Sequence, residues 1–123
     1  MPTSTTLEAL LYVQVTEGNT FHVRPSFFSG MMFGYPTRDY NHREVEVIKK
    51  GTTNATHLIT NTKGVYDPST KQAELYPGVC ETKVPFGDYT IKATIDGETV
   101  SRTITLNKDT KVLLLFQPKK STP

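Results

Sequence analysis

The chain of 123 residues has a single cysteine, Cys80, and no tryptophan. One cysteine excludes an internal disulfide, which leaves Cys80 as a small buried hydrophobe, an inert surface thiol or a link to another chain. No apolar run approaches the ~20 residues that span a bilayer. The amino terminus also lacks the charged and apolar regions of a signal peptide. We therefore expect no membrane insertion.

The chain also lacks an excess of charge of one sign. It carries 14 basic and 12 acidic side chains, for a formal net charge of +2, and they are scattered along the sequence. Binding to nucleic acid needs a basic stripe or patch that neutralises phosphates. The charge distribution therefore predicts that nucleic acid is not a partner.

Long helical segments are missing too, because eight glycines and eight prolines interrupt the chain at short intervals. Six tyrosines, six phenylalanines and many Thr and Val suit pleated, half-buried surfaces instead. Such a composition is typical of a sandwich or barrel. The length is that of one domain. We expect a single β-sandwich domain over residues 1–123, with polar tails at about 1–6 and 117–123 that flank a domain in a longer chain or simply fray.

Residues 84–116 show the clearest strand pattern and predict three consecutive antiparallel strands. Apolar and polar residues alternate over 89–95, and Asp96-Gly97 then supplies the two positive-φ positions of a type I′ turn. This turn predicts the pairs of facing residues: Ile95 with Glu98, Ala93 with Val100, Ile91 with Arg102, and Tyr89 with Ile104. Arg102 opposite Ile91 departs from the apolar pattern of that face.

Further short strands are expected at residues 8–16, 44–49, 54–61 and 73–76, and another one beginning at 65–66. An Asn- and Gly-rich turn is expected at 60–64. The total predicts an all-β fold, an antiparallel seven- or eight-stranded Greek-key β-sandwich of the prealbumin-like or immunoglobulin-like type. The strand order around residues 18–43 and 68–82 stays open, and the long segment 18–43 holds a binding loop or a missed strand.

Three short motifs occur in an order found in a known group of sandwich domains. They cover residues 46–51, then 60–66 with the pattern Thr-Asn-x-x-Gly-x-Tyr, then 85–91 with the pattern Pro-x-Gly-x-Tyr-x-Ile. In this the chain resembles the carboxypeptidase regulatory-like and Cna protein B-type domains. The resemblance implies the prealbumin-like, or transthyretin-like, sandwich over about residues 45–95. Residues 18–43 and 68–82 are longer than that pattern requires.

The same sequence gives little support for catalysis. Hydroxyisourate hydrolases of this fold end in Tyr-Arg-Gly-Ser, whereas this chain ends in 118–123, Pro-Lys-Lys-Ser-Thr-Pro. The isopeptide bond of some Cna B-type domains needs a Lys in the first strand and an Asn or Asp in the last, and neither expected strand supplies its residue. We therefore expect no enzyme, no catalytic residues and no isopeptide bond.

No metal site or cofactor is expected either, because the three histidines share no metal-ligand spacing: His22, His42 and His57. Glu44 and Glu46 share one face of an expected strand and are predicted to face water. Asn54 begins an N-glycosylation triplet, which matters only outside the cytoplasm.

The remaining candidate for function is the aromatic and methionine-rich run between residues 27 and 40. Exposed, it would form a protein-contact patch, and buried, an additional strand in the core. The predicted partner-binding residues are Met31, Met32, Phe33, Tyr35 and Tyr40. They predict a non-catalytic binding or structural module of a surface, virion or filament protein, contacting a protein or surface polymer. An extracellular or cell-surface location is favoured, and the oligomeric state is open.

The alternative function is a carbohydrate-binding module. Aromatic rings stack on sugar rings, and two or three tyrosines on one surface would form the platform. The candidates for it are Tyr35, Tyr40, Tyr66 and Tyr76.

Overall fold

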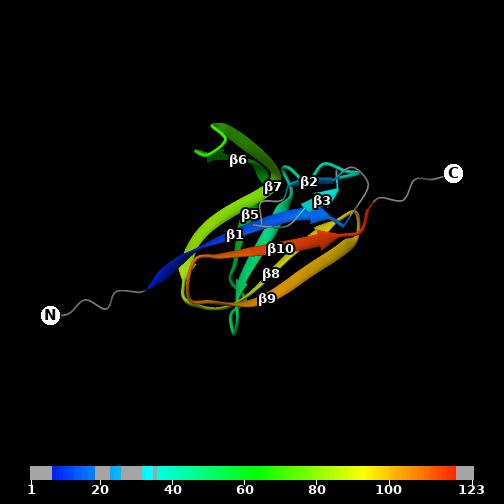
Figure 1. Cartoon of the computed structure of the whole chain (residues 1–123). Helices are drawn as coiled ribbons and strands as arrows, with labels where there is room; N and C mark the ends of the chain where they lie inside the picture. Colours follow the sequence, from blue (N-terminus) through cyan, green and yellow to red (C-terminus); the bar gives the residue numbers. More distant parts are fainter. Residues whose placement is uncertain (1–6, 19–22, 26–31, 35, 119–123) are drawn as a thin grey trace.

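The computed structural model describes residues 7–18, 23–25, 32–34 and 36–118 (Figure 1). All of its regular elements are strands. In chain order they are β1 (Glu8–Glu17), β2 (Val23–Pro25), β3 (Met32–Gly34), β4 (Glu44–Lys49), β5 (Ala55–Ile59), β6 (Asn61–Asp67), β7 (Gln72–Pro85), β8 (Gly87–Ile95), β9 (Glu98–Leu106) and β10 (Thr110–Phe116). No helix long and apolar enough to cross a membrane occurs among the described residues.

Eight of the strands form two four-stranded sheets. One has the order β10-β1-β7-β6 and the other the order β5-β4-β8-β9, while β2 and β3 form a separate two-stranded ladder. The expected all-β sandwich is confirmed. One pair departs from the antiparallel expectation, because β1 and β10 run parallel. The β2–β3 ladder supplies strands that the sequence left unassigned between residues 18 and 43.

The core lies between the two sheets and follows from the alternation of side chains along each strand. Leu11, Val13 and Val15 of β1 point inward and are fully buried, and alternate residues of β8 do the same. Cys80 faces the core opposite Val13, so of the three interpretations of this cysteine the structure shows the buried hydrophobe.

The hairpin formed by β8 and β9 has the predicted register. Its pairs run from Gly87 with Leu106 to Ile95 with Glu98. Asp96 and Gly97 have φ values of 52° and 83°, as a type I′ turn requires. Arg102 is exposed, and β9 lies at the edge of its sheet. An edge position lets this long side chain reach water although it faces Ile91.

The prediction of three consecutive paired strands over 84–116 was wrong for the third one. Strand β10 pairs with β1 in the opposite sheet and not with β9. The turn before β10 is held there by Asp109, whose Oδ1 accepts a hydrogen bond from the Leu10 N–H at 2.9 Å. The sequence predicted a strand in this region, but a strand pattern does not specify which sheet edge the strand joins.

The expected turn at 60–64 was also wrong, and the strand expected at 73–76 is part of a much longer one. Residues 61–67 form β6, and β7 runs unbroken through Pro77 and Gly78 for 14 residues. The chain reverses at residues 67–72 instead, where the Asp67 carbonyl accepts a hydrogen bond from the Lys71 N–H. In Figure 1 this end of the β6–β7 hairpin projects beyond the rest of the sandwich. We call residues 63–67 and 72–76 the distal arm.

Candidate functional site

The outer face of the β5-β4-β8-β9 sheet brings together two carboxylates and one imidazole. Glu44 and Glu46 alternate with buried Val45 along β4, so both point away from the core. On the neighbouring strand His57 lies directly opposite Glu46. Residues directly opposite on adjacent strands share a face. We call Glu44, Glu46 and His57 the outer-face cluster.

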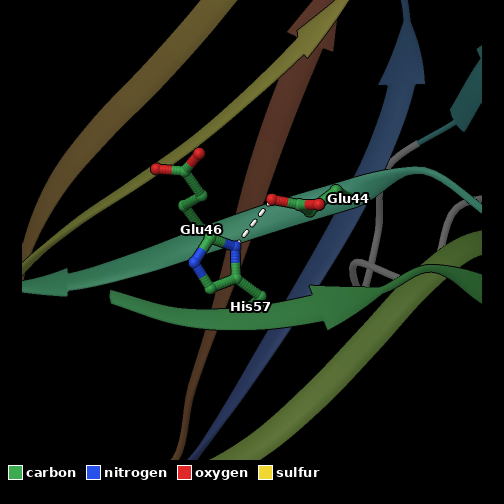
Figure 2. A group of neighbouring side chains, drawn as sticks. All are labelled: Glu44, Glu46 and His57. Carbon is green, nitrogen blue, oxygen red and sulfur yellow. Dashed lines mark hydrogen bonds and ion pairs between the residues drawn. The ribbon is translucent and has the colours of Figure 1, made fainter. Parts of the chain in front are cut away.

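Figure 2 shows the three side chains on the same face of β4 and β5, with the Glu44 carboxylate directed at the His57 ring. The Nδ1 atom of His57 lies 2.6 Å from Oε1 of Glu44. One potential ligand atom from each of the three residues lies within 4.8 Å of the other two. The side chains of His57 and Glu44 are 56% and 54% exposed, so the cluster is accessible from solvent.

A positive charge and an open pocket border the cluster. Lys92 of β8 is the cross-strand neighbour of Glu46, and its Nζ lies 3.8 Å from Oε2 of that residue. The pocket has a volume of ≈ 230 Å³ and is lined by Glu44, Glu46, Lys92, Ala93 and Thr94. Chemically, the cluster offers carboxylate oxygens and an imidazole nitrogen, which are ligands of divalent metal ions.

The sequence predicted the outward direction of Glu44 and Glu46 but not their histidine partner. His57 follows Glu46 by eleven positions, a spacing that matches no local metal motif. The two become neighbours because β4 and β5 form a hairpin in which Glu46 pairs with His57. A hairpin formed by the two expected strands, 44–49 and 54–61, would place Glu46 opposite His57. The signal for this contact was therefore present in the sequence.

A second polar cluster is enclosed at the end of β1. Glu17 is fully buried, and its carboxylate accepts hydrogen bonds from the Tyr40 hydroxyl at 2.5 Å and the Thr37 hydroxyl at 3.0 Å. The Thr37 N–H also donates to this carboxylate. Every buried side-chain nitrogen or oxygen of the described residues has a hydrogen-bond partner. We call Glu17, Thr37 and Tyr40 the enclosed cluster.

Arg38 connects the enclosed cluster to the tip of the β8–β9 hairpin. Its Nε donates to the Tyr40 hydroxyl at 3.2 Å, and its Nη1 lies 3.0 Å from Oδ2 of Asp96. Burial raises the pKa of Tyr40 well above its ordinary value, and the negative charge of Glu17 adds to the shift. The tyrosine therefore stays neutral, and its hydroxyl donates a hydrogen bond to the Glu17 carboxylate.

This position corrects the prediction for Tyr40 as a partner-binding residue. Its side chain is 1% exposed and packs against Phe116, with ring centroids 6.1 Å apart. The hydroxyl group made burial possible because Glu17 accepts its hydrogen bond. Tyr40 thus holds the segment after β3 to the core.

The other predicted contact residues remain predictions. Met31 and Tyr35 lie outside the described residues. Met32 and Phe33 belong to β3, whose backbone pairs with β2, and the structure describes nothing further of their side chains. The predicted protein contact at these four residues is therefore untested.

The tyrosines expected to form a carbohydrate platform do not share a surface where they are described. Tyr40 is buried. Tyr66 lies opposite Ala73, and Tyr76 lies opposite Lys63. These two cross-strand pairs are an odd number of residues apart, so Tyr66 and Tyr76 point to opposite faces of the distal arm.

One face of the distal arm carries large exposed apolar side chains. Tyr66 is 62% exposed and Leu75 is 65% exposed. Leu75 pairs with Gly64, two positions along the strands from the pair of Tyr66 with Ala73, so all four residues share this face. Within the described part of the chain, β6 pairs with β7 alone and is the edge strand of its sheet.

No protein-family model and no curated protein matches this chain. Among solved structures, the fold is similar to a DUF3823 family protein from Parabacteroides merdae, with a TM-score of 0.56 and 13% sequence identity. The similarity covers 93% of this chain and 48% of the other, so the chain spans about half the length of that protein. At this identity the likeness concerns the fold alone. It supports a β-sandwich.

Proposed function

We propose that the chain is a non-catalytic protein-contact module that pairs through the outer edge of β6. The observation that carries this proposal is the exposed face of the distal arm, where Tyr66 and Leu75 each expose more than three fifths of their surface. Large exposed apolar side chains beside an open strand edge favour the addition of another strand.

The sequence of β6 fits a second copy of itself. In an antiparallel pair centred on Val65, Lys63 of each copy lies opposite Asp67 of the other, and Gly64 lies opposite Tyr66. Opposite charges directly across a sheet are favourable. Lys63 already lies 3.1 Å from Glu81, so Asp67 of the second copy would add a second acidic partner.

The glycine at position 64 gives the tyrosine of the second copy room to pack. A Cβ atom at Gly64 would lie 3.3 Å from Cδ2 of Leu75, so Leu75 extends over this glycine. The ring of Tyr66 placed across from Gly64 would rest on that leucine. Pairing through β6 would therefore cover both exposed side chains, and we propose a homotypic contact.

A disulfide at the centre of this pair tests the proposal. In a Val65→Cys variant the two new thiols face each other across the two-fold axis, and we expect rapid formation of a disulfide-linked dimer under mild oxidation. The native Cys80 does not compete, because burial and the charge of Glu81 raise its pKa to about 12 and keep it protonated.

The matched control is Ser101→Cys, on the exposed edge strand β9. Dimer formation by Val65→Cys and not by Ser101→Cys supports the proposal. Equal, slow cross-linking of both variants, together with a monomeric native chain in sedimentation velocity, overturns it.

We further propose that the sandwich is of the prealbumin-like kind. The support is the order of the three motifs in residues 46–51, 60–66 and 85–91, which the carboxypeptidase regulatory-like and Cna B-type domains share. In this chain the second motif occupies β6 and the third begins β8. An experimental structure tests this assignment. Its strands should superpose, in the same order, on a prealbumin-like domain better than on an immunoglobulin domain.

A further inference from the structure

We propose that the outer-face cluster binds one divalent transition-metal ion, with Zn²⁺ as the ion that its ligands fit best. Two carboxylates and one imidazole are a ligand set that zinc accepts, and three protein ligands leave a coordination position for water. The imidazole nitrogen disfavours Mg²⁺ and Ca²⁺, which prefer oxygen ligands alone.

The geometry requires only small side-chain movements for binding. Two ligand atoms that share one zinc ion at about 2.1 Å are at most about 4.2 Å apart, and the three candidate atoms lie within 4.8 Å of one another. Glu44 and Glu46 are long side chains with exposed or half-exposed positions, so they can rotate to close this difference.

The backbone already holds the three residues in position. Glu46 and His57 are a directly opposed pair of the β4–β5 hairpin, and Glu44 lies two residues along β4 on the same face. Because β4 also pairs with β8, it is a central strand of its sheet. Metal binding therefore orders side chains but no backbone segment.

The interactions that the ion must replace are weak. The His57–Glu44 pair and the Lys92–Glu46 pair are both solvent-exposed or partly exposed. Exposed ion pairs contribute little to stability, so a metal ion can replace them readily. The pocket of ≈ 230 Å³ beside the two glutamates has space for water molecules on the remaining coordination positions.

Titration of the full chain with ZnCl₂ by isothermal calorimetry tests this proposal. We expect the native chain to bind one zinc ion. Loss of a residue that only supports a metal ligand lowers metal affinity by roughly 10- to 100-fold. His57→Asn and Glu46→Gln each remove a ligand, so they should lower the affinity by more than that. MgCl₂ should give no saturable binding at this site.

The matched control is His42→Asn. His42 is also an exposed histidine but lies outside the cluster, and asparagine tolerates its φ of 60°. We expect this variant to bind zinc as the native chain does. The ring nitrogens of His57, and not those of His42, should shift in NMR spectra on addition of zinc.

Circular dichroism shows whether each variant is folded, and the NMR shifts of the native chain give a result that depends on no variant. Absence of saturable zinc binding overturns the proposal. So does zinc binding that His57→Asn and Glu46→Gln leave unchanged, or a zinc-dependent shift confined to the other histidines. The Val65→Cys experiment is independent of this test, since β6 contributes no ligand.

Discussion

The enclosed cluster and the outer-face cluster both centre on glutamate, but they differ in every respect that decides what a carboxylate does. Glu17 is fully buried, and donors from Tyr40 and Thr37 surround it. The Glu44 side chain is 54% exposed and contacts one histidine. A buried carboxylate without partners is costly, whereas an exposed one exchanges its partners with water freely. The enclosed cluster therefore stabilises the fold, whereas the carboxylates of the outer-face cluster are available to bind ligands.

The two clusters also differ in the segments that they join. The enclosed cluster ties the end of β1 to residues 37–40, and Arg38 extends it to Asp96 in the β8–β9 turn. The outer-face cluster joins only β4 and β5, which are already hydrogen-bonded neighbours. Loss of the first should loosen one end of the sandwich, and loss of the second should change the fold little.

The largest expected effect comes from removing the buried carboxylate. Glu17→Ala should lower the free energy of unfolding by about 3 kcal/mol, because the Tyr40 hydroxyl and both Thr37 donors lose their acceptor. Urea unfolding measures this change. Glu46→Ala is the matched control and should change stability by less than ~0.5 kcal/mol. Equal effects of the two substitutions would contradict the distinction between the clusters.

Gly78→Ala should have the next largest effect on the free energy of unfolding. Gly78 has a φ of 74°, and a Cβ atom there would lie 2.3 Å from the Val15 carbonyl oxygen and 3.1 Å from Cβ of Tyr40. We expect a loss of about 2 to 3 kcal/mol from the strained φ and the clash. Gly51→Ala, at a φ of 82° but with open space around it, should cost only about 1 kcal/mol. Thermal or urea unfolding of both variants distinguishes crowding from backbone strain.

Tyr40→Phe should lower the free energy of unfolding by about 2 kcal/mol at neutral pH, because it removes a hydrogen bond to a buried charged group. Urea unfolding measures this change.

The native protein should also lose stability at alkaline pH. Burial holds the pKa of folded Tyr40 above 10.0, its ordinary value in the unfolded chain. Above that pH the unfolded state binds fewer protons, so the free energy of unfolding falls, by up to ~1.4 kcal/mol per pH unit.

The phenylalanine variant should lack this part of the alkaline slope. Tyr89, whose pKa is also raised by burial, remains in both proteins and serves as the internal reference. Urea unfolding between about pH 9 and pH 11 measures the difference in slope. Identical slopes would place the Tyr40 hydroxyl in contact with water.

The smallest effects should come from the outer-face cluster in the absence of metal. Glu44→Gln removes the charge that faces His57, and His57→Asn removes the ring. Each should change the free energy of unfolding by less than ~0.5 kcal/mol, since exposed pairs contribute little and salt screens them. A loss above ~1 kcal/mol in either variant would show that the cluster stabilises the fold.

The sequence predicted the elements that depend on neighbouring residues. The register of β8 and β9 follows from the alternation around Ile91 and from one Asp-Gly turn, both of which act over a few residues. The bounds of β4 agree with the strand predicted at 44–49 for the same reason. The outward direction of Glu44 and Glu46 followed from the buried Val45 between them.

The incorrect predictions arose where strand pairing or a tertiary contact overrode the local sequence pattern. The Asn and Gly at positions 61 and 64 suggested a turn, yet tertiary pairing with β7 holds both in a strand with a bulge between Asn61 and Lys63. Tyr40 resembled a surface aromatic because nothing nearby in sequence indicated that Glu17 would accept its hydrogen bond. Glu17 lies 23 residues before Tyr40, so no turn or alternation pattern reports this contact.

By itself the sequence determined the all-β class, the inward faces of the main strands and the β8–β9 hairpin. These follow from side-chain alternation and turn sterics, which are properties of adjacent residues. Only the tertiary structure decided that β10 joins β1 and that Glu17 is enclosed. Backbone hydrogen bonds at a strand edge are nearly independent of side-chain identity. Which edges meet is therefore decided by the packing of the whole chain.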